Sequence, residues 1–389
     1  MTSGDNPILA INSGSSTLKF GLFVLENGEE RALVHGSAEG IGKDGGKLEI
    51  FDGAGKSLHS ESRKYASQRE ALEHVTQAMS DAHTTRPVAV GHRIVHGGPK
   101  LRDHIRIDAG VLKTLDAATH FAPLHIPTSI ELLRAAENIY PSLPQFACFD
   151  TAFHKSLPED AYRYPLPAEF AQEGVRRYGF HGLSYASVVH QLGALLKPRA
   201  VIAHLGNGSS LAAVLEGKSI DTSMGMTPTG GVPMGTRSGD LDPGVVLYLM
   251  RVHKLDDKTL EELLNHKSGL LALGGESDMR RLQSAAAAGD PNAQLAIDIF
   301  CRAIARTVAA FAVSLGGLDA LVFAGGIGEH SAEVRANVCS RLGLLGIEID
   351  AARNQASEAL FSTGEIEARI IAAQEEAQMA REVRLLLAA

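Results

Sequence analysis

Cysteine and tryptophan are scarce in this sequence. Its 389 residues include three cysteines and no tryptophan, and aromatic residues make up only 5%. The cysteines, Cys148, Cys301 and Cys339, stand far apart and show no CxxC spacing. This argues against a disulfide framework and against a thiolate metal site, and it fits a reducing compartment. We therefore expect a cytoplasmic protein.

Long apolar runs and clusters of basic residues are also missing. No uncharged apolar run reaches the roughly 18 residues that a membrane span needs, and the opening MTSGDNPILA lacks a basic region followed by an apolar core. The formal net charge is -8 and the basic residues are scattered, so there is no electrostatic footprint for a polyanion. We expect a soluble protein with no membrane or nucleic-acid partner, in which any anion is bound locally.

What the sequence does contain is an alternation of strands, helices and glycine turns. PILAINSG and LKFGLFVLEN are apolar runs of strand length on either side of a turn of small residues. Residues 67–82 then place Leu72, Val75 and Met79 at helical spacing, and RPVAVGHRIV follows as a buried strand. This order is typical of an α/β fold, and the length suggests about two to three domains.

The second half of the sequence repeats the first in outline. AVIAHLGNGSSLAAVLEGK is again strand, small-residue turn and strand, with Gly208 falling 194 positions after Gly14. Residues 292–315 predict a long helix with an apolar face that includes Leu295 and Ile299, and LDALVFAGGIGEH repeats the strand-to-glycine ending of GHRIVHGG. The repeat predicts two similar domains facing each other across a cleft, each offering a glycine-rich turn to it. Chance similarity of two short Gly-Ser turns is the alternative.

The first of these turns, in NSGSSTLK, differs from a nucleotide P-loop. It lacks the GxxxxGK[ST] pattern and leads into a strand rather than a helix. Small residues let several backbone N–H groups point into one concavity, and Lys19 can add a point charge, so the turn is a candidate phosphate site. The alternative is a tight hairpin in which the serines cap their own backbone.

Two arginines and several polar residues stand in similar strand-end or loop segments. Arg93 lies in GHRIVHGG and Arg237 in MGTRSGDLDPG, and phosphoryl transfer between anions requires such cations to neutralise charge. For either arginine taken alone, the alternative is that it is a surface residue or that it binds backbone carbonyls. Asp150 ends a strand, where it caps a turn or orients a cation, substrate or arginine. His125 and His181 lack metal-ligand spacing and are better read as neutral hydrogen-bond donors.

With these residues in place, the chain resembles the acetate kinases of the short-chain acyl kinase family, whose superfamily also holds sugar kinases, actin and heat-shock ATPases. The likeness covers essentially the full length through ten segments in the family's order. They are NSGSSTLK, GHRIVHGG, APLHIP, FDTAFH, YGFHG, HLGNGSSL, TPTGGVPMGTRSGDLDPG, SDMR, FAGGIGEH and QEE.

The resemblance implies a fold and an activity. The fold would be α/β, with two duplicated ribonuclease-H-like, actin-like ATPase domains around a cleft. Residues 1–148 and 377–389 would form an acyl kinase domain, and 149–376 a nucleotide-binding and dimerisation domain. The activity would be reversible, direct in-line transfer of the ATP γ-phosphoryl group to acetate, giving acetyl phosphate and ADP. It would need Mg²⁺, with Mn²⁺ as a substitute, accept propionate as a second acid, and be carried by a homodimer.

The resemblance also assigns roles to residues. Arg93 and Arg237 would clamp the phosphoryl group and carboxylate, His181 would hydrogen-bond the transition state with support from His125, and Asp150 would position acetate, arginine or metal-bound groups. Nucleotide contacts would come from Ser15, Thr17, Lys19, His204, Leu205, Gly206, Asn207, Gly208, Asp278, Met279, Arg280, Gly326, Ile327, Gly328, Glu329 and His330. Val95, Leu124, Phe180 and Pro228 would surround the acetate methyl group beside Arg93, and Asn12 and Glu375 would hold the metal.

Some positions depart from the family pattern. Ile126 replaces Asn, HGLSY replaces HGTSH, GGVP replaces a run with Glu, Ala373 and Gln374 precede Glu375, and His330 ends GIGEH. Acid chain length therefore stays open among acetate, propionate and butyrate, since one methylene gives about 1–3 kcal/mol of discrimination. A nucleotide-binding regulator or chaperone-like ATPase remains the other class, but such a protein needs no pair of arginines focused on an acceptor anion.

Overall fold

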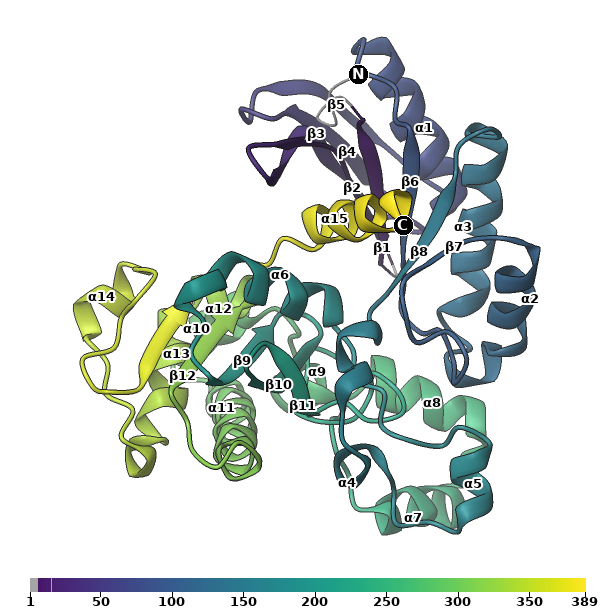
Figure 1. Ribbon diagram of the computed structural model, residues 1–389. Helices are drawn as coiled ribbons and strands as arrows, with labels where there is room; N and C mark the ends of the chain where they lie inside the picture. Colours follow the sequence, from purple (N-terminus) through teal and green to yellow (C-terminus); the bar gives the residue numbers. More distant parts are fainter. Residues whose placement is uncertain (1–5, 15) are drawn as a thin grey trace. The chain divides into compact units, whose positions relative to one another are not determined.

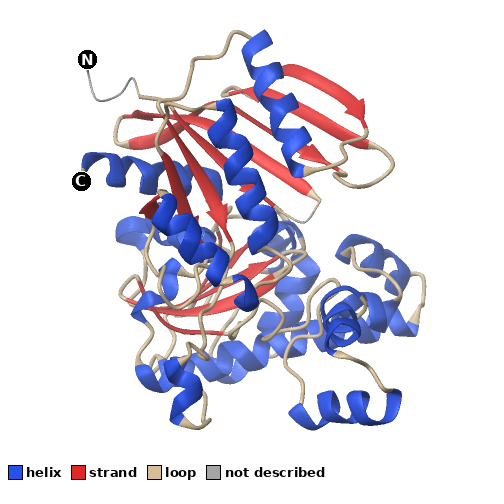
Figure 2. Ribbon diagram, turned by 90° about the vertical axis from the view of Figure 1, so that its right-hand side faces the viewer, coloured by secondary structure: helices blue, strands red, loops and turns tan. Residues whose placement is uncertain are grey.

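The structure is a computed structural model that describes residues 6–14 and 16–389. The chain forms two compact units, Met1–Ala152 together with Gln374–Ala389, and Phe153–Ala373. Each unit is built on its own β-sheet (Figures 1 and 2). The predicted division of labour, an acyl kinase domain and a nucleotide-binding and dimerisation domain, stays a prediction.

The sheet of the first unit has eight strands in the order β5-β4-β3-β2-β1-β6-β8-β7. The strands are β1 (Ile8–Ser13), β2 (Thr17–Glu26), β3 (Glu29–Glu39), β4 (Gly46–Asp52), β5 (Ser57–Arg63), β6 (Ala89–Ile94), β7 (Ile105–Arg106) and β8 (Gln145–Phe149). β1 and β2 pair antiparallel, as do β2 and β3, whereas β1 pairs parallel with β6 and β6 with β8.

Helices cover both faces of this sheet. They are α1 (Gln68–Asp81), α2 (Ala109–Ala117), the 3-10 helix η1 (Thr119–Phe121), α3 (Ile126–Ile139) and the C-terminal α15 (Glu375–Ala388). The predicted helical stripe of α1 is confirmed, because Leu72, Val75 and Met79 are buried in one cluster with Val90 of β6. The next residue of β6, Gly91, faces Val383 of α15 instead. Since successive strand residues point to opposite faces, α1 and α15 cover opposite faces.

The sheet of the second unit has five strands in the order β11-β10-β9-β12-β13. They are β9 (Arg199–Leu205), β10 (Ser209–Leu215), β11 (Lys218–Thr222), β12 (Ala320–Ala324) and β13 (Glu367–Ile370). The first three pair antiparallel and the last two add in parallel, which is the arrangement of β3-β2-β1-β6-β8. The predicted α/β fold with a duplicated unit is therefore confirmed, whereas the cleft concerns the placement of the units and stays a prediction.

The remaining helices belong to the second unit, apart from η2 (Ala152–Ser156), which begins on the last residue of the first. They are α4 (Glu159–Tyr162), α5 (Ala168–Gln172), α6 (Gly182–Leu192), η3 (Gly193–Leu195), α7 (Pro243–His253), α8 (Asp257–His266), α9 (Gly269–Gly274), α10 (Met279–Ala287), α11 (Pro291–Ser314), α12 (Gly325–His330), α13 (Ala332–Ser340), η4 (Gly343–Leu345) and α14 (Ala351–Gln355). No helix in the described ranges is long and apolar enough to span a membrane.

Helix α11 confirms the predicted long helix and corrects part of its face. Ile297, Phe300 and Ile304 are fully buried in the core cluster that α11 shares with β9 and β10. Leu295, which we expected on the apolar face, is 52% exposed. It stands two positions before Ile297, and two positions on a helix of 3.6 residues per turn lie on nearly opposite sides. Ile299 is half-buried.

Candidate active site

The turn between β1 and β2 is a closed hairpin held from outside. Gly14 N donates to Thr17 O at 2.8 Å, and Gln68 Nε2 at the start of α1 donates to Gly14 O at 2.8 Å and to Thr17 O at 3.3 Å. Ser15 lies outside the described residues. Lys19 is exposed and pairs in register with Asn12, which puts both side chains on one face of the sheet.

A buried polar cluster lies at the ends of β1, β6 and β8. Arg93 Nε donates to both carboxylate oxygens of Asp150, at 2.9 and 3.1 Å, and its Nη2 donates to Oδ2 at 2.6 Å. Its Nη1 donates to Asn12 Oδ1 at 3.1 Å. Asp150 is 1% exposed. A strand-end aspartate and a neighbouring strand-end arginine thus form one bidentate pair, which fixes the plane of the guanidinium.

The pair couples a buried cation to a buried carboxyl group. Burial by itself lowers the pKa of Arg93, but the attraction of Asp150 and Glu375 outweighs it, so the pKa is raised. Burial raises the pKa of Asp150, and although the charge and hydrogen bonds of Arg93 oppose that effect, the pKa stays above its usual value. Three charge-assisted contacts at 2.6 to 3.1 Å favour the carboxylate. Arg93 is therefore a fixed cation.

Two carboxylates at the start of α15 share the amide of Asn12. Its Nδ2 donates to Glu375 Oε2 at 2.9 Å and to Glu376 Oε1 at 2.7 Å. Acids in a first helical turn are favourable by the helix dipole, and oxygen donors of this kind are the ligands that Mg²⁺ and Mn²⁺ prefer. No cluster of three or more His, Cys, Asp and Glu side chains occurs in the part of the chain that the structure describes. The two carboxylates fit such a cation, and the Asn12 side chain lies beside them with its Nδ2 toward the carboxylates and its Oδ1 toward Arg93.

In the second unit, the turn after β9 brings a histidine and an arginine together. A Cβ atom on Gly208 would lie 3.1 Å from His181 Nε2 and 3.6 Å from Arg237 Nη1. Arg237 Nη1 also donates to Pro228 O at 3.2 Å, the carbonyl-anchoring contact that we considered as its alternative role. The glycine therefore leaves open a space that two nitrogen groups border.

His181 holds a strained backbone position at the start of α6. Its φ is +58°, a left-handed conformation that non-glycine residues seldom adopt and that is frequent at functional sites. Its Nδ1 lies 2.8 Å from Ser210 Oγ, and its ring stacks on that of His204 with 4.5 Å between the centroids. His204 Nδ1 lies 2.8 Å from Ser184 Oγ.

The predicted nucleoside segments gather at the same edge of the second sheet. Ala324 pairs with His204 in the β12–β9 ladder, so α12 and the β9–β10 turn start side by side. Gly235 N donates to Asn207 O at 3.2 Å, and a Cβ atom on Gly235 would lie 3.4 Å from Ser277 O, beside Asp278.

Several nucleotide candidates also have structural tasks in this unit. Asp278 Oδ1 accepts from Arg280 N at 2.8 Å and caps α10, while Met279 and Leu205 are buried. Glu329 Oε1 accepts from Gly325 N at 2.9 Å and from Ala373 N at 3.1 Å. Any nucleotide contact of these residues would therefore use backbone or exposed side-chain atoms. Gly326, Ile327, Gly328 and His330 lie in the same short helix, α12.

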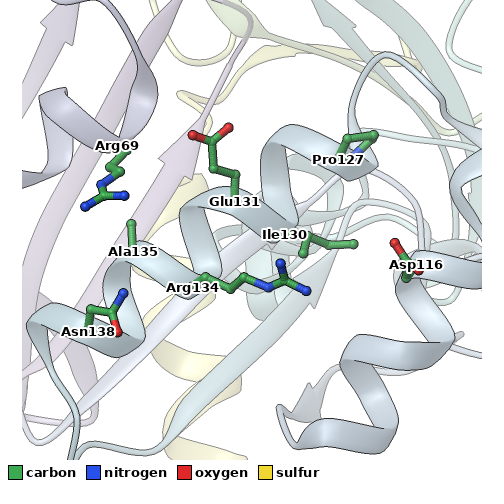
Figure 3. A pocket seen from close by; sticks show the side chains of 8 residues that line it. All are labelled: Arg69, Asp116, Pro127, Ile130, Glu131, Arg134, Ala135 and Asn138. Carbon is green, nitrogen blue, oxygen red and sulfur yellow. The ribbon is translucent and has the colours of Figure 1, made fainter.

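The four residues predicted around the acetate methyl group belong to different units, two to each. Phe180 and Pro228 of the second unit are buried, whereas Val95 of the first is half-buried and Leu124 is 46% exposed. His125 is half-buried at the N-cap position of α3. A surface hollow of about 450 Å³ between α1, α2 and α3 is lined by none of the predicted residues (Figure 3).

Several groups at these sites are not among the predicted residues. Glu376 accepts a hydrogen bond from the Asn12 amide, as Glu375 does. The two adjacent acids in QEE were the sequence feature that could have indicated it. Gln68, which holds the first turn, follows no motif that we used. His154 is buried, with Nε2 3.1 Å from Phe180 O, and so supports the backbone before His181.

Comparisons with known proteins agree with this geometry. Residues 7–381 match the model of the acetokinase family. The chain is 42% identical to an acetate kinase of Dichelobacter nodosus over 90% of this chain and 89% of that protein. It is 40% identical to a propionate kinase of Citrobacter rodentium, covering 98% and 97%. The crystal structure of a propionate kinase from Francisella tularensis superposes with a TM-score of 0.90 at 38% identity, covering 97% of this chain and 98% of that one. This chain belongs to the acetokinase family.

Proposed function

We propose that this chain is an ATP:carboxylate phosphotransferase of the cytoplasm that transfers the γ-phosphoryl group reversibly to acetate, with propionate as a second acceptor. Relatives named acetate kinase and propionate kinase at similar identity support both acids. All three cysteines are free and buried, which suits a reducing compartment. The single observation that carries the proposal is the Arg93 guanidinium, fixed by Asp150 and Asn12 in a buried cluster.

Arg93 is suited to bind the acceptor carboxylate. Arginine has five N–H donors, and within the described residues three of them point to Asp150 and Asn12, which leaves two for an anion. A planar guanidinium that is already oriented pays little entropy on binding a carboxylate in this way. Val95, two positions after Arg93, and Leu124, beside His125, are the apolar residues of the first unit that we assign to a short alkyl group.

His181 and Arg237 are suited to contact the transferring phosphoryl group. A carboxylate oxygen forms the new bond to the γ-phosphorus while the bond to the β–γ bridging oxygen breaks and ADP keeps the electron pair. No proton moves, because the acid is already ionised. Charge on the equatorial oxygens is what donors such as His181 Nε2 and Arg237 Nη1 would stabilise.

Asn12, Glu375 and Glu376 would hold Mg²⁺, or Mn²⁺ in its place. Bound there, the cation would neutralise phosphate charge. The three side chains already share hydrogen bonds, so they are kept near one another before a cation binds.

The proposed oligomer is a homodimer that uses helix α7. Nine of its residues besides Pro243 and Gly244 form VVLYLMRVH, and none of its side chains is buried. Leu247 and Tyr248 are each 53% exposed and Val252 is 55% exposed. An apolar helix without a buried face is typical of an interaction surface. We propose that a second copy of this chain binds to it.

A test with Arg93→Ala separates this function from that of a nucleotide-binding regulator. Acyl phosphate is measured as hydroxamate with ATP, magnesium and acetate. We expect the variant to remain folded and to lose about 100-fold or more in kcat/KM, as when a charge-stabilising donor is removed. Arg134→Ala, on the exposed side of α3, is the matched control and should keep wild-type activity. Wild-type yields from Arg93→Ala would refute the proposal.

The same assay defines the range of acids. We expect kcat/KM for propionate to fall within about 200-fold of that for acetate, since one methylene gives about 1–3 kcal/mol of discrimination, and butyrate, with two extra methylenes, is measured beside them. A larger lead of acetate would limit the proposal to that acid.

A further inference from the structure

Behind His181 lies a chain of two hydroxyl groups. Tyr185 Oη is 2.5 Å from Ser210 Oγ, and Ser210 Oγ is 2.8 Å from His181 Nδ1. Tyr185 and Ser210 are both 0% exposed, so the chain is closed to solvent. The residues come from two elements, α6 for Tyr185 and β10 for Ser210, and His181 caps the first of these.

The direction of these hydrogen bonds follows from the proton of Tyr185. Burial raises the pKa of the Tyr185 hydroxyl, so it keeps its proton at neutral pH. Ser210 Oγ is the hydrogen-bond partner of this hydroxyl among the described residues. A buried hydroxyl that does not donate costs about 1–3 kcal/mol, so Tyr185 O–H donates to Ser210. The single proton of Ser210 is then directed to His181, because a serine hydroxyl has one donor and can accept on its other side.

We infer that Tyr185 and Ser210 are positioning residues that fix His181 as the tautomer with its proton on Nε2. A neutral imidazole that accepts at Nδ1 must carry its proton at Nε2. That nitrogen is the one beside Gly208 and Arg237 Nη1. The inference rests on the proposed function for its consequence, which is that the Nε2–H group would be the one that donates to the phosphoryl oxygens.

The left-handed backbone of His181 supports this reading. The φ of +58° costs of order 1–3 kcal/mol, and such strain persists where surrounding contacts fix the residue. Stacking on His204, at 4.5 Å between centroids, holds the plane of the ring, and Ser210 then holds its rotation within that plane. Ring position and proton position are thus fixed by different neighbours.

The tautomer can be read directly by nitrogen NMR on protein labelled with ¹⁵N-histidine. The chain has 16 histidines, and the His181 signals are assigned by their loss in His181→Gln. Spectra are recorded at about pH 8.5, two units above the ordinary histidine pKa of about 6.5. We expect the Nε2 shift of His181 to be that of a protonated nitrogen and the Nδ1 shift that of an acceptor. The opposite pattern would overturn the inference.

Kinetics of Tyr185→Phe and Ser210→Ala measure the effect on the reaction. We expect kcat to fall about 3- to 10-fold in Tyr185→Phe, where one neutral hydrogen bond is lost, and further in Ser210→Ala, with little change in KM for the acid. The His181 spectrum should show a rising share of the Nδ1-protonated form in the same order. Tyr140→Phe is the matched control, because Tyr140 Oη also donates to a hydroxyl, Thr76 Oγ1 at 3.3 Å, in the other unit.

The outcomes separate the two proposals. A wild-type protein that makes no acyl phosphate refutes the proposed function, while the tautomer spectrum still tests the hydroxyl chain. An active wild type with unchanged His181 spectra in both variants refutes the hydroxyl chain alone. A fall in kcat equal to that of Tyr140→Phe, or one accompanied by a loss of folded protein with unchanged spectra, would reduce Tyr185 to a packing residue.

Discussion

Gly208 is the residue on which the second unit's donors converge. A Cβ atom there would lie 3.1 Å from His181 Nε2 and 3.3 Å from His181 Cε1, closer than most real Cβ contacts. The φ of Gly208 is not in the left-handed range, so its backbone can accept alanine. We expect Gly208→Ala to fold normally and to lose about tenfold or more in kcat, the scale of a misplaced donor.

Gly343→Ala is the control for this substitution. Gly343 also lies in the second unit outside the left-handed range, and nothing is within 4 Å of a Cβ built on it. Both variants are compared in the hydroxamate assay and in thermal unfolding. Equal kcat values for the two variants would show that the space over Gly208 is not used.

The sequence identified some residues of the candidate site but not all of their contacts. The resemblance named Asn12, Arg93 and Asp150 separately, and the structure brings them together because they lie at the ends of the neighbouring strands β1, β6 and β8. The resemblance named Glu375 alone for the metal, whereas the Asn12 amide contacts both Glu375 and Glu376, and that sharing depends on the position of the amide in the fold. The direction of side chains, not their identity, was the missing information.

Among the elements, helix α7 is the one whose apolar surface we assign to a second copy of the chain. Since none of its side chains is buried, Leu247→Glu should leave the fold intact. If a second copy covers α7, the charge should weaken the dimer by at least about 30-fold, which corresponds to loss of a contact worth about 2 kcal/mol. Light scattering behind size exclusion at several protein concentrations measures the effect.

Val313→Glu provides the control for Leu247→Glu. Val313 is 81% exposed on α11, so it carries the same change of charge to a different helix. Leu247→Glu should shift the population toward monomer while Val313→Glu does not. A wild-type protein that is monomeric at all concentrations would refute the homodimer.

The elements themselves were predictable where periodicity is strong. The duplicated α/β unit followed from the match between two turns 194 positions apart, and α11 followed from its apolar repeat, whereas the order of the strands was not predicted. Leu295 was placed on the wrong side because alanines, Ala293 and Ala296, fill part of the buried stripe and carry little hydrophobic signal. The exposure of α7 could not be predicted either, because an apolar sequence pattern is the same whether the helix is buried in the core or exposed.

For the molecule as a whole, two buried histidines make stability depend on pH. Burial lowers the pKa of His92 in the first unit and of His154 in the second to about 4, although hydrogen bonds to Gln145 Oε1 and Phe180 O oppose the shift. In the unfolded chain a histidine has a pKa of about 6.5. Between these values the unfolded state binds more protons than the folded state, so stability rises with pH across that window and falls as the solution is acidified.

The expected loss is large relative to a typical folding free energy. On acidification from about pH 7.5 to about pH 5, each histidine lowers the free energy of unfolding by about 2 kcal/mol. The free energy of unfolding of a protein is usually about 5–15 kcal/mol. Urea unfolding at both pH values measures it, and His92→Gln should flatten the dependence of the first unit, whatever its effect on stability at neutral pH. His253→Gln, at an exposed site, should leave the dependence unchanged. If wild type and His92→Gln lose the same free energy on acidification, His92 is not the group that titrates.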